Sequence, residues 1–233
     1  MTISVVIPAY NEEKYLPRTL ESLKKLLRQP DEVVVINASS TDKTEDVAKR
    51  YGARVVTTPL KTIGYSRQMG LKAAKSDVVA FTDSDAILPP DWLTYIEETL
   101  KQPGVVGFFG GFRIPDGPWW YRLYINIVQP ILNIVYFRIF GLAMATGQNM
   151  AFYKKKALDV GGFPEEFKMA EDLEIAKRLQ SIGKIVFKQD FYVIASGRRG
   201  NEGFFELVAR ISKVFFYYIL FHRADKIGFP SIR

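Results

Sequence analysis

Short apolar runs alternate with amphipathic stretches along the first hundred residues of the chain. The apolar runs are rich in Val and Ile and have the length of buried strands. Between the first two runs, leucines recur at every third or fourth position from Leu16 to Leu27, which is the spacing of one face of a helix. The pattern predicts strands at residues 3–8, 32–37, 54–57 and 78–82, and helices at residues 13–27, 42–51 and 64–74.

Strands and helices that alternate in this way predict βαβ units, so the fold class is α/β with a mostly parallel sheet flanked by helices. In such sheets, ligands bind beyond the carboxyl ends of the strands. Polar segments follow three of the predicted strands directly, at residues 11–12, 37–40 and 83–85. We therefore expect these three segments to share one crevice.

Asp83 and Asp85 stand at the end of the fourth predicted strand and are separated by one residue. In an extended chain, residues i and i+2 point to the same side, so the two carboxylates can converge on one point. Two hard oxygen ligands suit Mg2+ or Mn2+, which commonly hold a substrate phosphate in their remaining positions. Because Asp and Ser are also common turn residues, an Asp-rich turn without a metal is the alternative.

The composition of the 233-residue chain excludes several kinds of site. There are no cysteines, so disulfides, zinc–thiolate sites and thiol nucleophiles are ruled out. His222 is the single histidine, which argues against a Ser-His-Asp triad and leaves acid–base work to carboxylates. With 48% hydrophobic and 14% aromatic residues, the chain is folded and long enough for one large domain.

The positive charge lies in the second part of the chain. Residues 1–100 hold 13 Lys or Arg against 14 Asp or Glu, whereas the remaining residues hold 19 against 11. A basic second half favours an anionic partner such as a phosphate or an acidic membrane surface. Nucleic acid is not expected, because the aromatic residues there form long apolar runs and do not alternate with Lys and Arg. The polar start leads into a strand without a signal-peptide pattern, so a cytoplasmic location is expected.

Five short motifs follow one another along the chain in a fixed order. They are Pro8-Ala9-Tyr10-Asn11-Glu12, Asn37-Ala38-Ser39-Ser40-Thr41-Asp42, Asp83-Ser84-Asp85, Gly161-Gly162-Phe163, and Glu171-Asp172-Leu173-Glu174 with Arg178-Leu179 and Gly183. Together they resemble the signatures of family 2 glycosyltransferases of the GT-A fold. The resemblance covers roughly residues 3 to 200, and although each motif is short, five in this order are specific together. No G-x-G-x-x-G follows the first strand, which argues against a dinucleotide oxidoreductase.

The resemblance implies an inverting transfer of a sugar from a nucleotide-sugar donor, such as a UDP- or GDP-sugar, with a divalent metal as cofactor. It implies that Asp172, paired with Glu171, is the general base, and that Asp85 is the direct metal ligand. Asp83 would face both the ribose and the metal. The nucleotide-binding set implied in this way is Pro8, Ala9, Tyr10, Glu12, Asn37, Arg67, Asp83 and Ser84. Without the resemblance, a helix N-terminal acid favoured by the helix dipole is the preferred interpretation of Asp172, and a residue on a solvated helix face is the alternative for Arg67.

Asn37 departs from the family pattern. The family usually has an Asp at this position, in a run of two acids followed by Gly-Ser, and that Asp often contacts the base. Asn37-Ala38 removes both charges and leaves an amide that can donate as well as accept. The identity of the base, whether uracil, guanine or thymine, therefore stays open.

Residues 119–147 form the most apolar stretch of the chain. Only 15 residues separate Arg122 from Arg138 and Pro130 interrupts them, so a spanning helix of about 20 apolar residues is a poor fit. Arg122, Asn126, Gln129 and Asn133 follow a 4-3-4 spacing, which places one polar stripe on an otherwise apolar helix. An interfacial helix in the membrane plane fits this pattern. A helix in the core or in a dimer interface fits it equally.

Two further segments point to anionic partners. Arg198 and Arg199 stand between glycines, which suits bidentate binding of a donor diphosphate or a phosphorylated acceptor by a loop, although a basic turn is the alternative. Residues 204–221 predict a helix that is first amphipathic and then apolar all round, with cations just beyond it. Such an end suits an anionic membrane surface.

The expected organisation has three parts. Residues 1–113 form the nucleotide-sugar-binding half, residues 114–200 the acceptor-binding half with the apolar insertion, and residues 201–233 a membrane-associated helix. The expected function is transfer of a sugar to an acceptor hydroxyl or phosphate, on a lipid-linked acceptor such as a polyprenyl phosphate or glycolipid at the inner face of the cell membrane. The alternatives are a soluble homodimeric transferase with a non-lipid acceptor, and a catalytically inactive protein that binds nucleotides or membranes.

Overall fold

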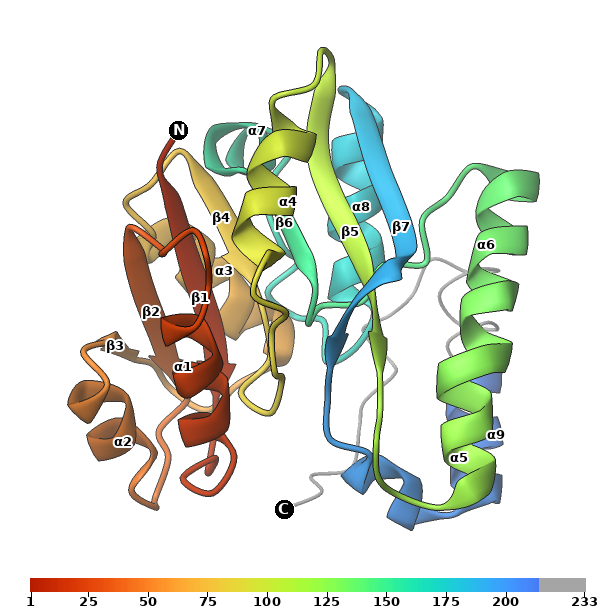
Figure 1. Ribbon diagram of the computed structural model, residues 1–233, viewed down its shortest axis with the longest axis horizontal. Helices are drawn as coiled ribbons and strands as arrows, with labels where there is room; N and C mark the ends of the chain where they lie inside the picture. The colour runs from red at the N-terminus through yellow and green to blue at the C-terminus, as the bar shows by residue number, and fades with distance from the viewer. Residues whose placement is uncertain (214–233) are drawn as a thin grey trace.

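The computed structural model describes residues 1–213 and contains a seven-stranded sheet in the order β3-β2-β1-β4-β6-β5-β7 (Figure 1). The pairs β1–β2, β1–β4, β2–β3 and β5–β7 are parallel, and β6 runs antiparallel to both of its neighbours. The mostly parallel α/β sheet expected from the sequence is therefore confirmed. The strands are β1 (Ile3–Ala9), β2 (Glu32–Asn37), β3 (Arg54–Thr57), β4 (Val78–Phe81), β5 (Val105–Arg113), β6 (Met150–Tyr153) and β7 (Lys184–Ile194).

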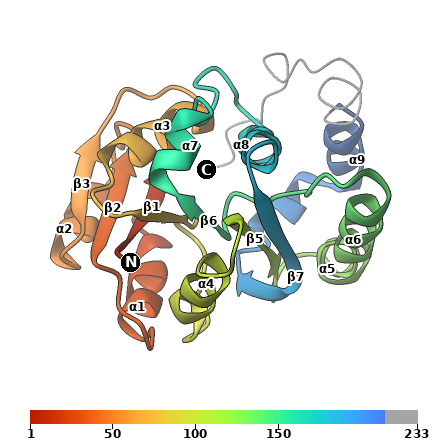
Figure 2. The same cartoon turned by 90° about the horizontal axis from the view of Figure 1, so that it is seen from above.

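Helices cover both faces of the sheet, and each face has its own apolar core (Figure 2). Helices α3 (Ile63–Ala73), α7 (Lys154–Asp159) and α8 (Glu171–Gln180) pack on one face, around Phe81 and Phe152. Helices α1 (Leu16–Lys24), α2 (Thr44–Arg50) and α4 (Trp92–Leu100) pack on the other face, around Trp92 and Phe108. The result is a three-layer sandwich, as the alternation of strands and helices predicts.

The first four strands and first three helices lie where the sequence predicts them, with ends shifted by up to three residues. Helix α4 and strand β6 were not predicted. The last strand, β7, is long, and its pairing with β5 slips between Gly110 and Gly111. A side chain at Gly111 would collide with the backbone oxygen of Gln189, so glycine makes this close approach possible.

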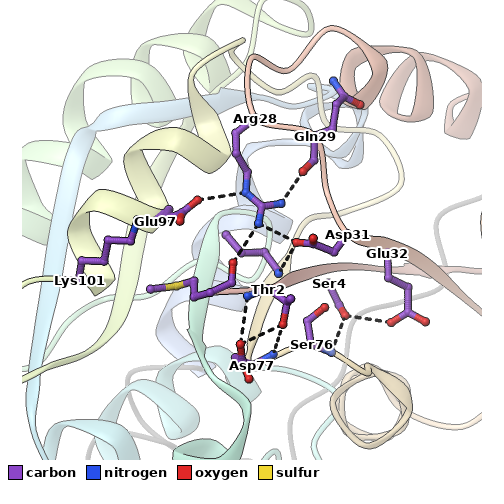
Figure 3. A network of polar contacts seen from close by, with 12 residues as sticks. Thr2, Ser4, Arg28, Gln29, Asp31, Glu32, Ser76, Asp77, Glu97 and Lys101 are labelled. Atoms are coloured by element: carbon purple, nitrogen blue, oxygen red, sulfur yellow. Dashed lines mark hydrogen bonds and ion pairs between the residues drawn. The ribbon is translucent and has the colours of Figure 1, made fainter.

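Polar contacts tie the amino ends of the central strands together, away from the ends that face ligands (Figure 3). Thr2 precedes β1 and exchanges three hydrogen bonds of 3.0–3.1 Å with Asp77, which precedes β4. Asp31 precedes β2 and accepts a 2.8 Å hydrogen bond from Ile3 N and a 2.6 Å bond from Arg28. This network fixes the strand register at one end of the sheet and leaves the carboxyl ends free to form a site.

Residues 119–140 form one continuous helical segment at the far edge of the sheet, made of α5 (Trp119–Leu123), the π-helical turn η1 (Tyr124–Val128) and α6 (Gln129–Phe140). The expected interruption at Pro130 is therefore wrong. Pro130 lies in the first turn of α6, directly after the wider π turn, so its missing N–H does not end the helix. Within residues 1–213 this is the one helix long and apolar enough to cross a membrane by length and composition, and 17% of its apolar window is buried.

The short 3-10 helix η2 (Arg198–Glu202) follows β7 and leads into α9 (Phe204–Lys213), which lies beside α5. The rings of Trp120 and Phe204 meet edge to face at 5.7 Å. The apolar part of the helix expected at residues 204–221 begins at position 214 and lies outside the described residues.

Candidate functional site

A cleft of about 700 Å3 opens at the carboxyl ends of β1 and β4. It is bounded on one side by α3 and the segments that follow β1, β2 and β4, and on the other by α6, α8 and the segment after β7. The predicted site residues that line it come from five separate segments of the chain. They are Pro8, Ala9, Tyr10, Glu12, Arg67, Asp83, Ser84, Asp85, Glu171, Asp172, Arg198 and Arg199.

The loop after β1 is held in place by the loop after β2. Asn11 has a positive φ of 54° and its backbone N–H donates to the Ser40 hydroxyl at 2.9 Å. The Glu12 backbone N–H donates to the Thr44 hydroxyl at 2.7 Å. These contacts direct the Glu12 side chain into the cleft, where it is largely buried.

Asn37 does not line the cleft, although the sequence placed it with the nucleotide-binding residues. It is buried at the end of β2, behind Ala38, which does line the cleft. Its side-chain oxygen accepts a 3.0 Å hydrogen bond from Ser40 N, and its amide nitrogen donates to Glu45 at 3.0 Å. The amide therefore completes a local network in which an Asp would place two carboxylates face to face.

Asp83, Ser84 and Asp85 follow β4 directly, as predicted. Asp83 accepts a 2.9 Å charge-assisted hydrogen bond from Arg67, whose guanidinium is almost fully buried in α3. Burial, together with the negative charge of Asp83, raises the pKa of Asp85 to about 6. The raised pKa shows that the negative charge of Asp85, beside that of Asp83, is poorly compensated. A cation bound here would stabilise the charged form of Asp85.

The residues at this end of the cleft fit a divalent metal that is shared with a substrate. Asp83 and Asp85 offer hard oxygen ligands, which suit Mg2+ or Mn2+. Within residues 1–213, no group of three or more His, Asp or Glu side chains is arranged to hold a metal by itself. The donor set thus matches an ion that takes its remaining ligands from a diphosphate and from water, and does not match a closed protein cage.

Glu171 and Asp172 begin α8 and face the cleft from the opposite side. Asp172 accepts hydrogen bonds from the backbone N–H groups of Gly147 at 2.8 Å and Leu173 at 2.9 Å. Burial and the charge of Asp172 raise the pKa of Glu171 to about 7, and burial raises the pKa of Asp172 as well. Burial thus raises the pKa of both neighbouring carboxyl groups, and perturbed pKa values of this kind are frequent at catalytic sites.

Arg67 connects the two groups of carboxylates. Its Nε lies 3.3 Å from Glu171, and its guanidinium also contacts Asp83 at 2.9 Å. Only 4% of its side chain is exposed. A Cβ at position 147 would collide with this guanidinium, so Gly147 leaves the space that Arg67 occupies.

Arg198 closes the cleft over the carboxylates of Glu12 and Asp85. It binds both oxygens of Glu12, at 2.7 and 3.1 Å, and lies 3.2 Å from Asp85. Its guanidinium also stacks over the ring of Tyr15 at 4.4 Å. Arg199 is exposed at the rim of the same cleft.

Several lining residues were missed by the sequence reasoning. Gln129 and Asn133 belong to the polar stripe for which the sequence left a membrane interface, the core and a dimer interface open, and both line the cleft. Gly147 and Tyr15 also contribute, through the Asp172 hydrogen bond and the Arg198 stacking. The 4-3-4 spacing revealed the stripe, but nothing in one sequence states which way a stripe faces.

The chain matches the family model described as glycosyl transferase family 2 over residues 4–161. The poly(ribitol-phosphate) beta-N-acetylglucosaminyltransferase TarS of Staphylococcus aureus is 29% identical over 87% of this chain and 37% of its own length. The chain spans between about a third and a half of the length of such curated relatives.

Two solved structures share the fold. A mannosyltransferase of Pyrobaculum calidifontis in complex with GDP-Man and Mn2+ has a TM-score of 0.71 at 22% identity, covering 91% of this chain and 60% of that one. Glucosyl-3-phosphoglycerate synthase of Mycobacterium tuberculosis, in complex with Mn2+, UDP and glucosyl-3-phosphoglycerate, has a TM-score of 0.65 at 22% identity, covering 94% and 78%. The expected GT-A fold is confirmed.

Proposed function

This chain belongs to glycosyl transferase family 2, and from that premise we propose that it transfers a sugar from a nucleoside-diphosphate sugar to an acceptor hydroxyl or phosphate, with inversion at the anomeric carbon. The observation that carries the proposal is the meeting of two carboxylate groups across one cleft. Glu12, Asp83 and Asp85 lie on one side, and the pair Glu171–Asp172 lies on the other. Binding a nucleotide alone requires no base, so the second pair favours catalysis over the inactive alternative.

Direct displacement assigns a task to each group. The Asp172 carboxylate takes the proton of the acceptor hydroxyl as the acceptor oxygen bonds to the anomeric carbon. The bond from that carbon to the diphosphate oxygen breaks, and its electron pair leaves with the nucleoside diphosphate. The Gly147 and Leu173 N–H groups orient the Asp172 carboxylate before the reaction. Arg198 and Arg199 would contact the diphosphate, whose negative charge grows as it leaves.

A divalent metal held by Asp83 and Asp85 would supply a positive charge at the leaving diphosphate. The two neighbours that contain Mn2+ support this part of the proposal. Glu12, Tyr10 and Pro8 would line the nucleoside pocket. The donor would be a UDP- or GDP-sugar, which the UDP and the GDP-Man in those same neighbours support.

We also propose that the acceptor is lipid-linked and that the protein acts peripherally at the cytoplasmic face of a membrane. The apolar segment 119–140 forms one wall of the cleft, so the acceptor side of the site adjoins an exposed apolar surface. A soluble homodimer with a non-lipid acceptor is the competing function, and its apolar segments would be buried between two copies.

Thermal unfolding with a panel of nucleoside diphosphates and nucleotide sugars, with and without Mn2+, tests the transferase proposal. A ligand at about 100 times its Kd stabilises the folded state by about 2.7 kcal/mol, which is easily seen as a higher melting temperature. We expect one base to give a metal-dependent shift that Asp85→Asn abolishes and Asp172→Asn retains. The absence of a shift with every nucleotide would overturn the proposal.

A further inference from the structure

The helical segment 119–140 turns its polar stripe towards the protein. Asn126 bonds to both the N–H and the C=O of Ile114, at 2.9 Å each, and buried Asn133 donates to Gln189 of β7 at 3.2 Å. Tyr121 and Ile125 are buried on the same inner side. The opposite side is apolar and open to solvent, with exposures of 53% for Ile127 and 67% for Ile139. An ordinary surface helix has a polar outer side, so this apolar outer side is unusual.

The open side extends over two elements. The residues that form it, here called the outer apolar face, are all large and exposed, and Figures 1 and 2 place the two elements at the same end of the molecule. They are Trp119, Leu123, Ile127, Val128, Ile131, Leu132, Ile134, Val135, Ile139 and Phe140 of the 119–140 segment, with Phe204, Phe205 and Val208 of α9. So many large apolar side chains exposed at one end of a molecule mark an interaction site.

We propose that the outer apolar face docks flat onto an anionic lipid surface. Exposed Arg122 and Arg138 stand near the two ends of the helical segment, and no Asp or Glu occurs between Asp116 and Asp159. Apolar side chains framed by cations, with Trp119 exposed at one end, match the interface between headgroups and acyl chains. The chain continues from α9 into residues 214–221, whose sequence is also apolar and is followed by His222 and Arg223.

A second copy of the chain fits this face less well. In a two-fold antiparallel pairing centred on Pro130, Arg122 of each copy would lie opposite Arg138 of the other. In a parallel pairing, each arginine would meet its own counterpart. Since the 117–158 stretch contains no acidic residue, neither arrangement gives these cations a partner from that stretch.

The inner polar stripe determines the orientation. A helix that crosses a bilayer would have to leave its hydrogen bonds to Ile114 and Gln189 and take unpaired polar side chains into the lipid. These bonds hold its inner side to the protein. Docking is therefore parallel to the membrane plane. Because Gln129 and Asn133 on that inner side line the cleft, docking also brings the acceptor end of the cleft to the lipid surface. This last step rests on the proposed function, and the docking itself does not.

Vesicle flotation of the full chain tests the docking, with phosphatidylcholine vesicles compared with vesicles that also contain phosphatidylglycerol. We expect binding to the anionic vesicles and a blue shift of the Trp119 emission that Trp119→Phe removes. The double variant Ile127→Glu/Ile131→Glu should bind at least tenfold more weakly. Its control is Leu27→Glu, which places the same charge at an exposed leucine beside α1 and should bind normally.

Arg122→Gln and Arg138→Gln should each weaken binding to anionic vesicles about fivefold. Asp85→Asn and Asp172→Asn should bind vesicles normally, so a failure of docking and a failure of catalysis give different results. The inference is overturned if the double variant floats like the unmodified chain while substitutions within residues 214–221 abolish flotation. It is equally overturned if the unmodified chain is a dimer in detergent-free buffer that the double variant dissociates.

Discussion

Arg198 and Glu12 form a bidentate ion pair, with N–O distances of 2.7 and 3.1 Å, although 186 residues separate them in the chain. The same guanidinium lies 3.2 Å from Asp85. The pair joins the segment after the last strand to the loop after the first strand, at the centre of the cleft. Arg198 therefore provides positive charge at the position where a bound metal would supply it and where a diphosphate would need it.

Arg198 and a metal ion would both contact Asp85, which leads to a first prediction. In Arg198→Gln, Mn2+ no longer competes with a guanidinium for Asp85, so we expect its affinity without nucleotide to rise about three- to tenfold. Affinity for a nucleoside diphosphate in the presence of Mn2+ should fall about tenfold or more, because a charge-assisted hydrogen bond is lost. Titration calorimetry measures both. Arg50→Gln, an exposed arginine at the end of α2, is the control, and parallel losses of both affinities in Arg198→Gln would contradict the prediction.

Asp85 is expected to lower the stability of the ligand-free protein. Burial and Asp83 raise its pKa from 3.8 to about 6. The folded state thus holds this proton more tightly than the unfolded state does, so the cost is absent below about pH 4, grows towards pH 6 and is complete above it. We expect Asp85→Asn to raise the free energy of unfolding by about 1–3 kcal/mol near neutral pH and to have little effect near pH 4.

Urea unfolding at the two pH values measures this difference, and the exposed Asp91→Asn, outside the cleft, serves as the control. If Asp85→Asn raises the free energy of unfolding equally at both pH values, the effect does not come from ionisation of Asp85. Protons and Mn2+ compete for the same Asp85 carboxylate, so Mn2+ binding to the unmodified protein should weaken as the pH falls through about 6.

The Glu171–Asp172 pair predicts the pH dependence of transfer. Burial raises both pKa values, and the charge of Asp172 helps to raise that of Glu171 to about 7, so the pair retains a proton at lower pH. We expect kcat to rise with pH up to about 7, and Asp172→Asn to lower kcat by about 10²–10⁴ with donor binding retained. Glu171→Gln removes a neighbouring negative charge and should move the acidic limb to lower pH. If the acidic limb of the kcat profile stays at the same pH in Glu171→Gln, the two carboxyl groups are not coupled.

Much of this site could be predicted because its residues follow strands directly. Asp83 and Asp85 end a short apolar strand, and the carboxyl ends of parallel strands meet at one edge, so local sequence and general topology were sufficient. The Arg198–Glu12 pair could not be predicted, because it depends on how β7 returns past the sheet after an antiparallel strand, β6, inserts between β4 and β5. The inward direction of Asn133 depends in the same way on buried Gln189, a polar partner 56 residues further along the chain.

Arg67 illustrates the same limit and supplies a stability prediction. The sequence left open whether it lies on a solvated helix face, yet it is buried between Asp83 and Glu171. Arg67→Met would leave these carboxylates without their cation, and we expect a loss of about 3–5 kcal/mol. Arg54→Met removes a more exposed pair with Glu32 and should cost about 1 kcal/mol or less. Urea unfolding compares the two variants, and equal losses would contradict the buried role of Arg67.

Asn37 gives the last prediction, through its partner Glu45. The Asn37 amide donates to Glu45 at 3.0 Å, and Lys49 pairs with the same carboxylate at 2.6 Å. Asn37→Asp restores the residue type usual in the family, but it replaces this hydrogen bond with two facing carboxylates, so we expect the melting temperature to fall by a few degrees. Glu45→Gln in the same chain supplies a new amide that can donate to the new carboxylate, and it should restore the melting temperature.

Thermal unfolding of the two single variants and the double variant measures the coupling between these positions. If the double variant melts no higher than Asn37→Asp alone, the hydrogen bond between the side chains at positions 37 and 45 is not the reason that an amide is stable at position 37. The nucleotide panel applied to the double variant then asks whether position 37 influences the base. Asn37 lies behind Ala38 and outside the cleft lining, so we expect the preferred base to stay the same.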